Sequence, residues 1–183
     1  VQQAELTILK DFMELCDRHG LDYFGIAGTG IGVLRHEGFI PWDDDVDLLM
    51  PRPDFDKLHD LLRKGNIRPY YKLISLQMGN SFWPLAKIID TPTYVKNEYS
   101  NVDHHLWIDT FPMDGLPDDN EESDILLSKA EPIEKWINRC SATIGKGKGF
   151  VQSIVKIPMI LFLRMYTPER FGRKLDKLAH QYD

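Results

Sequence analysis

The spacing of apolar residues along the chain predicts helices and strands that alternate over much of its length. Apolar positions recur at helical spacing over residues 3–18, 29–36 and 54–64, which predicts three helices. Shorter runs of apolar and β-branched residues predict strands over 22–27, 44–50, 71–77, 83–90, 92–96 and 105–111. Helices interleaved with strands indicate an α+β domain with a mixed α/β sheet.

The chain changes character after residue 116. A polar run over 117–124 leads into a helical pattern that continues to about residue 140. Residues 168–182 predict a basic helix, whose charged face is most simply solvated. We therefore expect a core domain over 1–116 and a helical extension over 117–183 that packs on it.

Two further segments lie between these helices. The Gly-Lys run 145–149 has the composition of a flexible hinge, and it lacks the spacing and the Ser/Thr of a P-loop. Residues 150–166 mix apolar clusters with polar residues and are too short and too polar to span a bilayer. An amphipathic helix packed on the domain is the preferred interpretation, and a helix on a membrane surface is the alternative.

Four aspartates gather around one predicted strand. Asp43, Asp44 and Asp45 are consecutive, and Asp47 follows one apolar residue later. Alternation along a strand places Asp45 and Asp47 on one face. Neighbouring carboxylates repel one another until a divalent cation lies between them, and oxygen ligands favour Mg²⁺ or Mn²⁺. Asp45 and Asp47 are therefore candidate metal ligands, with Asp43 as a third, and a solvated acidic turn is the alternative.

A glycine-rich turn precedes this acidic strand. Residues 23–37 run from a strand-like piece through Gly28, Thr29 and Gly30 into a short helix. Such a turn leaves backbone N–H groups at a helix start, where phosphate binds readily. Gly28 allows close approach of a ligand, Thr29 offers a hydroxyl, and Arg35 supplies a charge suited to phosphate. An ordinary strand-to-helix connection is the alternative, and the acidic strand that follows favours the phosphate site.

Two sequence blocks resemble the signature of the LicD family. The first reads AGTGIGVLRHEGFIPWDDDVDLLM, and the second, at 106–116, reads LWIDTFPMDGL. The match covers much of residues 1–116 and is loose after residue 120. The family includes bacterial phosphocholine transferases and is similar to the fukutin-type ribitol-phosphate transferases. The resemblance implies a nucleotidyltransferase-like fold, to which the C-terminal helical extension is added.

The resemblance also implies roles for residues of both blocks. In nucleotidyltransferase-like folds a glycine turn opens a helix, one strand carries two aspartates, and a later strand adds a third carboxylate. These places fall here to Gly28 and Thr29, to Asp45 and Asp47, and to Asp109. Asp109 lies in an apolar run, so a solvated position explains it poorly, although it could instead cap the turn that follows.

Two positions depart from the family pattern. Ala27 stands where the family often has glycine, and Gly30 stands where a larger aliphatic residue is common. Neither change removes a candidate ligand. We expect the loop to approach a nucleotide somewhat differently as a result.

Four other residues near the two blocks have two interpretations each. Lys87 lies in an apolar strand at a position where the family often has a lysine or arginine, so it either binds phosphate or points to solvent. His36 either touches substrate or hydrogen-bonds the acidic strand. Trp42 and Trp107 flank the acidic positions and either line a ligand pocket or pack in the core.

The composition is that of a compact globular domain. At 183 residues and 43% hydrophobic content, the chain can bury a full core. The net charge of −6 and the pI near 5.5 argue against nucleic acid as the main partner. Cys16 and Cys140 are too few for a disulfide framework and are expected to be buried apolar residues. No signal peptide is visible, and we expect a cytoplasmic protein, with peripheral contact at the inner membrane surface as a further expectation.

The activity that the resemblance implies is metal-dependent phosphotransfer. Phosphocholine is the first candidate group, moved from a CDP-activated donor such as CDP-choline to a hydroxyl of a cell-surface glycan, with release of CMP. Lipopolysaccharide, teichoic acid or a lipid-linked precursor is the expected acceptor. A nucleotidyltransferase acting on a small molecule, sugar or protein is the first alternative, because the acidic strand serves both reactions. A non-catalytic relative that binds nucleotide or glycan is the second.

The expected catalytic carboxylates are Asp45, Asp47 and Asp109, which are also the expected Mg²⁺ or Mn²⁺ ligands. Asp109 is the preferred acceptor of the hydroxyl proton. Residues expected to bind substrate phosphate are Gly28, Thr29, Arg35, His36 and Lys87.

Overall fold

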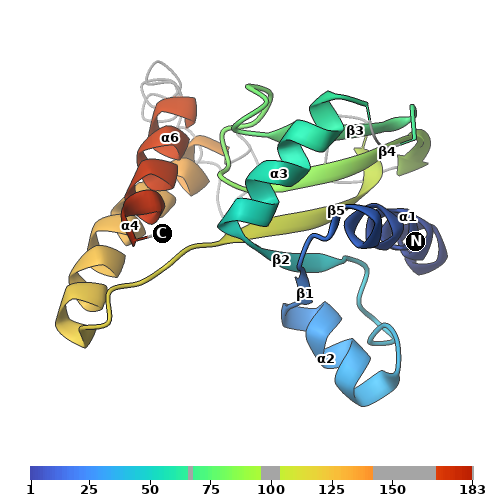
Figure 1. The fold of residues 1–183 in the computed structure, drawn as a ribbon, viewed down its shortest axis with the longest axis horizontal. Coiled ribbons are helices and arrows are strands. Elements are labelled where there is room, and N and C mark those ends of the chain that lie inside the picture. The colour runs from blue at the N-terminus through green and yellow to red at the C-terminus, as the bar shows by residue number, and fades with distance from the viewer. Residues whose placement is uncertain (66–67, 96–103, 142–167, 183) are drawn as a thin grey trace, which may run out of the picture. The chain divides into compact units, whose positions relative to one another are not determined.

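The computed structural model describes residues 1–65, 68–95, 104–141 and 168–182 (Figure 1). The chain forms two compact units. The first unit comprises residues 1–80 and 85–113, and the second comprises residues 81–84 and 114–183. Among the described residues, none of the helices has the length and apolar content needed to cross a bilayer.

The first unit is built on a five-stranded sheet with the strand order β1-β2-β5-β4-β3 (Figure 1). Its strands are β1 (Phe24–Gly25), β2 (Asp47–Pro51), β3 (Tyr71–Ser75), β4 (Ala86–Val95) and β5 (His104–Met113). Strands β2 and β5 run parallel, and the other neighbours run antiparallel. The predicted mixed sheet of an α+β domain is therefore confirmed.

Three helices accompany this sheet, namely α1 (Gln2–His19), α2 (Ala27–His36) and α3 (Arg52–Arg63). Helix α1 ends at Gly20, which adopts the left-handed conformation with φ of 60° and closes the last turn through its N–H to the carbonyl of Cys16. Helix α3 follows β2 directly, and Pro53 lies in its first turn, where a missing N–H costs nothing.

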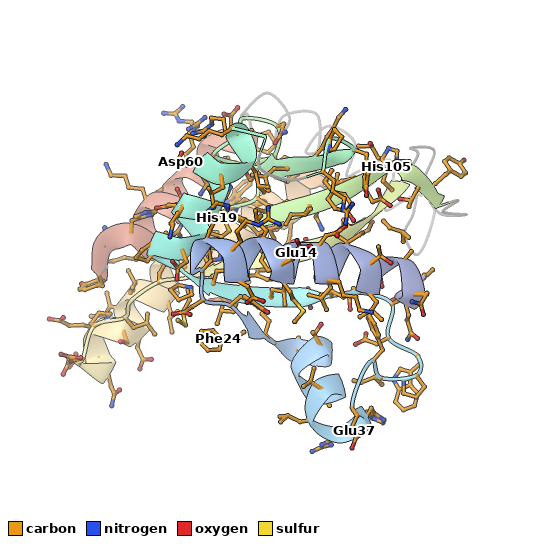
Figure 2. The ribbon with its side chains drawn as sticks, turned by 45° about the vertical axis from the view of Figure 1, so that its right-hand side comes forward. Glu14, His19, Phe24, Glu37, Asp60 and His105 are labelled. Carbon is orange, nitrogen blue, oxygen red and sulfur yellow. The ribbon has the colours of Figure 1, made fainter. Side chains whose placement is uncertain are left out.

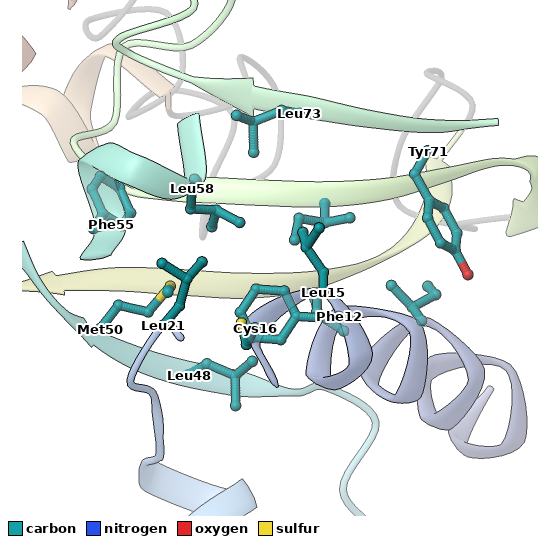
Figure 3. Close-up of a cluster of buried hydrophobic side chains, with 14 of the residues drawn as sticks. Phe12, Leu15, Cys16, Leu21, Leu48, Met50, Phe55, Leu58, Tyr71 and Leu73 are labelled. Carbon is teal, nitrogen blue, oxygen red and sulfur yellow. The ribbon is translucent and has the colours of Figure 1, made fainter. Parts of the chain in front are cut away.

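The main core lies between the sheet and helices α1 and α3 (Figure 3). Phe12 and Leu15 from α1 and Phe55 and Leu58 from α3 are almost completely buried there. The strands contribute alternate residues to the same face, namely Leu48 and Met50 of β2, Ile88 of β4 and Ile108 of β5. Because side chains alternate along a strand, the intervening residues project from the opposite face of the sheet.

Cys16 is part of this core, as predicted, and burial raises the pKa of its thiol to about 12. Such a thiol stays protonated and behaves as a small apolar group. Cys140 belongs to a helix of the second unit, but its side chain lies outside the described residues.

The second unit contains α4 (Asn120–Ser141), α6 (Pro168–Ala179) and the 3₁₀ turn η1 (His180–Tyr182). Ile133 and Ile137 of α4 pack with Leu175 of α6 in a separate apolar cluster. The rings of Trp136 and Phe171 stack at 6.0 Å with an interplanar angle of 5°. The predicted C-terminal helices are confirmed at α4 and α6. The predicted hinge over 145–149 and the predicted helix over 150–166 lie outside the described residues.

Several strand predictions were wrong in their boundaries, and two differences affect the site. The predicted strands 83–90 and 92–96 are one strand, β4, which begins at Ala86 and continues through Pro92. Pro92 is tolerated because the pairing of β4 with β3 ends at Asp90, and the pairing with β5 is irregular between Asp90 and Val95. The acidic strand begins at Asp47 instead of residue 44.

Candidate functional site

Three charged residues form a row across three neighbouring strands. Asp47 of β2 pairs in register with Asp109 of β5, and Asp109 pairs in register with Lys87 of β4. The neighbours Leu48, Ile108 and Ile88 face the main core. The row therefore lies on the opposite face of the sheet, and strand pairing alone places these side chains side by side.

Lys87 and Trp107 both hold the Asp109 carboxylate. Lys87 Nζ lies 2.7 Å from Asp109 Oδ1 and donates a hydrogen bond of 2.9 Å to Oδ2. The Trp107 indole Nε1 also donates to Oδ2, at 2.9 Å. In addition, Lys87 Nζ stands 4.5 Å from the centre of the Trp107 ring, which is a cation–π contact. The Lys87 side chain thus points toward Asp109. Trp107 belongs to the site, because it contacts both Asp109 and Lys87.

The other aspartates lie on the loop that enters β2. Asp45 is exposed and precedes the strand, while Asp43 is half-buried. Gly28, at the start of α2, lies against the Asp43 carboxylate, because a Cβ added to Gly28 would stand 2.0 Å from Asp43 Oδ2. A carboxylate in this place benefits from the helix dipole. In this structure, Asp43 therefore lies beside the turn at which a phosphate was predicted.

The start of α2 is tied to the acidic strand. The backbone N–H of Asp47 donates to Thr29 Oγ1 at 2.9 Å, and the N–H of Ile26 donates to the carbonyl of Asp47 at 3.1 Å. Gly30 approaches β1 closely, since an added Cβ would stand 2.7 Å from the carbonyl oxygen of Gly25. The larger aliphatic residue common in the family would not fit here without a shift of the backbone.

Ala27 begins α2 with an unusual backbone conformation. Its φ is 47°, in the left-handed region that glycine adopts without cost. The Cβ of an L-residue crowds the backbone in this region and costs about 1–2 kcal/mol. The structure thus gives a physical reason why a glycine suits this position.

Helix α1 holds the acidic loop through a residue that sequence analysis missed. Gln2 Nε2 donates hydrogen bonds to the carbonyl of Ile40, at 3.1 Å, and to the carbonyl of Asp43, at 2.6 Å. The acceptors are backbone atoms far along the chain, so no local pattern could have indicated this role.

The carboxylates of the site raise one another's proton affinity. Although the Asp45 side chain is exposed, partial desolvation raises its pKa, and the charge and hydrogen bond of Asp43 raise it further. Burial likewise raises the pKa of Asp47, as do the negative charges of Asp45 and Asp109, while Lys87 opposes this effect. Negative charge is therefore in excess at the site, and a bound cation would relieve it.

Glu5 of α1 is a second residue that the sequence did not indicate. Its side chain is only 3% exposed, and its Oε2 has no hydrogen-bond partner. Burial raises the pKa of Glu5 to about 7, and the negative charge of Asp44 is the next cause. The sequence gives no sign that Glu5 is buried, because it falls among the polar residues of an amphipathic helix.

Arg35 and His36 lie away from the acidic row. Both are exposed in the last turn of α2, about 10 Å along the helix axis from Gly28. The next residue, Glu37, marks the end of α2 that is remote from the sheet (Figure 2). The contact of Arg35 and His36 with a phosphate stays a prediction.

Trp42 is 83% exposed, so the interpretation of Trp42 as a core residue was wrong.

The carboxylates suit a divalent metal by their chemistry. Oxygen ligands with excess negative charge favour Mg²⁺ or Mn²⁺. Asp109 Oδ1 is buried and receives no hydrogen bond, although Lys87 Nζ pairs with it electrostatically. Within the described residues, however, no three acidic, histidine or cysteine side chains already stand together as a metal site. A cation would therefore need a small movement of the loop carboxylates toward the row.

Comparison with known proteins gives a family and one long match. The family model described as LicD/FKTN/FKRP, nucleotidyltransferase domain, matches residues 20–134. The lipopolysaccharide cholinephosphotransferase LicD of Haemophilus influenzae is 29% identical over 165 residues, which are 87% of this chain and 62% of that protein. The chain thus spans less than two thirds of the length of this relative.

A shorter match and the search for solved structures complete the comparison. An uncharacterised protein of Rickettsia prowazekii is 36% identical over 55 residues, which are 30% of this chain and 21% of that protein. No solved structure matches the chain. The family match covers more than half of the chain and contains every predicted site residue. The chain therefore belongs to the LicD family.

Proposed function

We propose that this protein is a phosphotransferase that moves phosphocholine from CDP-choline to a hydroxyl of a cell-surface glycan, with release of CMP. The observation that carries the proposal is the row of Asp47, Asp109 and Lys87, which strand register places on one face of the sheet. Its choice of substrate rests on the relative from Haemophilus influenzae, whose name specifies choline phosphate and lipopolysaccharide.

The residues of the row have different roles in binding the donor and in activating the acceptor hydroxyl. Lys87 would bind the diphosphate of the donor, because its ammonium group lies at the site face and can exchange its bond to Asp109 for one to phosphate. Trp107 would then keep Asp109 oriented through its indole N–H. The backbone N–H groups of the first residues of α2 would bind a second phosphate oxygen once Asp43 moves aside.

A hydroxyl nucleophile needs a group that takes its proton. Asp109 is already engaged by Lys87 and Trp107, whereas the described contacts include no hydrogen bond to the Asp47 carboxylate. Burial and the charges of Asp45 and Asp109 raise the pKa of Asp47, which favours uptake of a proton by this carboxylate. We therefore assign the general base to Asp47 and a positioning role to Asp109, which refines the expectation from sequence.

Mg²⁺ is the proposed cofactor, and Asp45, Asp47 and Asp109 would hold it, with Asp43 as a further candidate. When bound, the ion would neutralise negative charge on the diphosphate and on the departing CMP. The residues of the chain fit this role because their carboxylates are crowded and raise one another's pKa, while Lys87 only partly offsets this effect at Asp47.

The first experiment is a product analysis with CDP-choline, Mg²⁺ and lipopolysaccharide. Release of CMP together with choline phosphate on the acceptor is the expected result. Release of pyrophosphate from a nucleoside triphosphate, with nucleotide left on the acceptor, would establish the nucleotidyltransferase alternative instead. Tight nucleotide binding with no product would favour a binding protein.

Variants connect this activity to the row. Asp47→Asn and Asp109→Asn should each lower CMP release at least about 100-fold. Asp56→Asn changes an exposed aspartate of α3 outside the site and should leave the rate within about twofold. An unchanged rate in both row variants, with the fold intact, would contradict the assignment of the site.

A further inference from the structure

A groove in the second unit combines a basic rim with an apolar floor. It lies along α4, α6 and η1 and has a volume of about 580 Å³. Lys129 of α4 and Lys174 and Lys177 of α6 line it. Pro132, Ile133 and Leu178 form the apolar part of the lining. Ile133 and Leu178 also belong to the apolar cluster between the two helices, so the floor is anchored in packed structure.

The three lysines differ from Arg173 and Lys135 of the same helices. Arg173 pairs with Glu169 at 2.6 Å, and Lys135 pairs with Glu131 at 2.5 Å. Lys129, Lys174 and Lys177 are exposed, and within the described part of the chain none of them has a carboxylate partner. The groove therefore concentrates positive charge that the protein itself leaves uncompensated, in a chain whose net charge is −6.

The shape and chemistry of the lining favour an anion that carries an aliphatic chain. Lysine stems extend along apolar surface while their ammonium groups reach water or a headgroup. Among the described residues that line the groove none is aromatic, so this lining offers no platform for stacking a nucleotide base. A free phosphate would use the lysines but not the apolar floor.

We propose that this groove binds the phosphate headgroup of an anionic membrane lipid, with the first part of an acyl chain on the floor of Ile133 and Leu178. The basic residues would hold the protein at a negatively charged membrane surface. This inference is independent of the proposed phosphotransfer, because it concerns binding by the second unit and its test measures no activity.

The test is co-sedimentation of the 183-residue chain with vesicles. Vesicles of phosphatidylcholine with one third phosphatidylglycerol should bind the protein, and vesicles of phosphatidylcholine alone should not. The triple variant Lys129→Gln, Lys174→Gln, Lys177→Gln should bind the anionic vesicles on the order of 100-fold more weakly, because each surface lysine contributes roughly fivefold. Raising the salt concentration should weaken binding of the unaltered protein.

A matched control has the same change in net charge at other places. Lys10, Lys64 and Lys72 are exposed residues of the first unit, and their triple change to Gln should lower vesicle binding by less than about fivefold. Equal losses in the two triple variants would overturn the proposal, since net charge alone would explain them. Equal binding to neutral vesicles would also overturn it.

A soluble competitor separates the lipid from a free anion. Inorganic phosphate at equal ionic strength should displace the protein no better than chloride, whereas dihexanoyl phosphatidic acid below its micelle concentration should compete. Displacement by inorganic phosphate at low millimolar concentration would overturn the lipid assignment and would identify a site for soluble phosphate. Circular dichroism of both triple variants checks that the helices are intact.

Discussion

The carboxylates on the strands and those on the preceding loop are held in place in different ways. Asp47 and Asp109 are fixed by the hydrogen-bonded register of β2 and β5. Asp43 and Asp45 lie outside the strand, and the loop is fixed mainly by two hydrogen bonds from Gln2 and by the close approach of Gly28. The difference shows that one half of the site is built by the fold itself, while the other half depends on a few side chains.

The largest expected effect concerns Glu5 of α1, whose carboxyl is buried and lies near the negative charge of the acidic loop. Glu5→Gln should increase the free energy of unfolding by about 3 kcal/mol above pH 7, because the pKa of Glu5 is raised from 4.5 to about 7 in the folded chain. The unfolded chain releases this proton at lower pH than the folded chain. The penalty from Glu5 therefore grows as the pH rises from about 4.5 to 7, and the gain of the variant should vanish below that interval.

Urea unfolding at several pH values measures this gain. Glu14 lies on the same helix and is exposed, and Glu14→Gln should change stability by less than about 0.5 kcal/mol (Figure 2). A pH-independent gain in Glu5→Gln would contradict this account, because it would show that the pKa of Glu5 is the same in the folded and the unfolded chain.

The strand half of the site, which contains Asp47 and Asp109, is tested by removing the cation Lys87. Lys87→Met should lower the free energy of unfolding by about 2 kcal/mol at pH 7, because the Asp109 side chain is only 13% exposed and would lose its ion pair. Millimolar Mg²⁺ should restore part of this loss if the carboxylates bind the ion. Lys72→Met on neighbouring β3 provides the control, and a loss there of similar size would show that the effect is general.

The loop half is tested through Gln2. Gln2→Ala removes two hydrogen bonds to the loop and should cost about 1–2 kcal/mol, with a weaker Mg²⁺ affinity measured by calorimetry. Gln2→Glu keeps the size of the side chain but has no N–H to donate, so it should not rescue the loss. Gln3→Ala, at an exposed neighbour, should be neutral, and an unaltered Mg²⁺ affinity in Gln2→Ala would separate α1 from the site.

The smallest expected effect lies at the junction between β1 and α2. Ala27→Gly should stabilise the protein by up to about 1 kcal/mol, because glycine relieves the positive φ of 47° but loses more chain entropy on folding. Ala4→Gly within α1 should instead destabilise by about 1 kcal/mol. Thermal unfolding of the two variants should therefore show shifts of opposite sign.

Sequence reasoning predicted the strand half of the site better than the loop half. The apolar alternation around Asp47 and Asp109 identifies strands, and a mixed sheet brings such strands together. The same reasoning extended the acidic strand back to residue 44, because Asp45 and Val46 continue the alternation. The in-register pairs of β2 with β5 begin at Asp47, although the carbonyl of Val46 accepts a hydrogen bond of 2.8 Å from the Asp109 N–H. Pairing partners, and not propensity, decided where the strand begins.

The contacts that remained hidden are those between distant segments. Gln2 donates hydrogen bonds to the backbone carbonyls of Ile40 and Asp43. Trp107 donates its indole N–H to Asp109, two positions further along the same strand. The first contact has no local signature. The second could have been suspected from strand parity, which places Trp107 and Asp109 on one face, but parity alone does not distinguish a hydrogen bond from simple packing.

The parallel pairing of β2 with β5 also has a consequence for how the chain folds. These strands are far apart in sequence, and their union places Asp47 directly opposite Asp109. Closing so long a loop is entropically slow, and the two like charges oppose the final approach. Refolding should therefore accelerate when either aspartate is neutralised or when Mg²⁺ is present, so the residues that serve the site also set a barrier on the route to the native state.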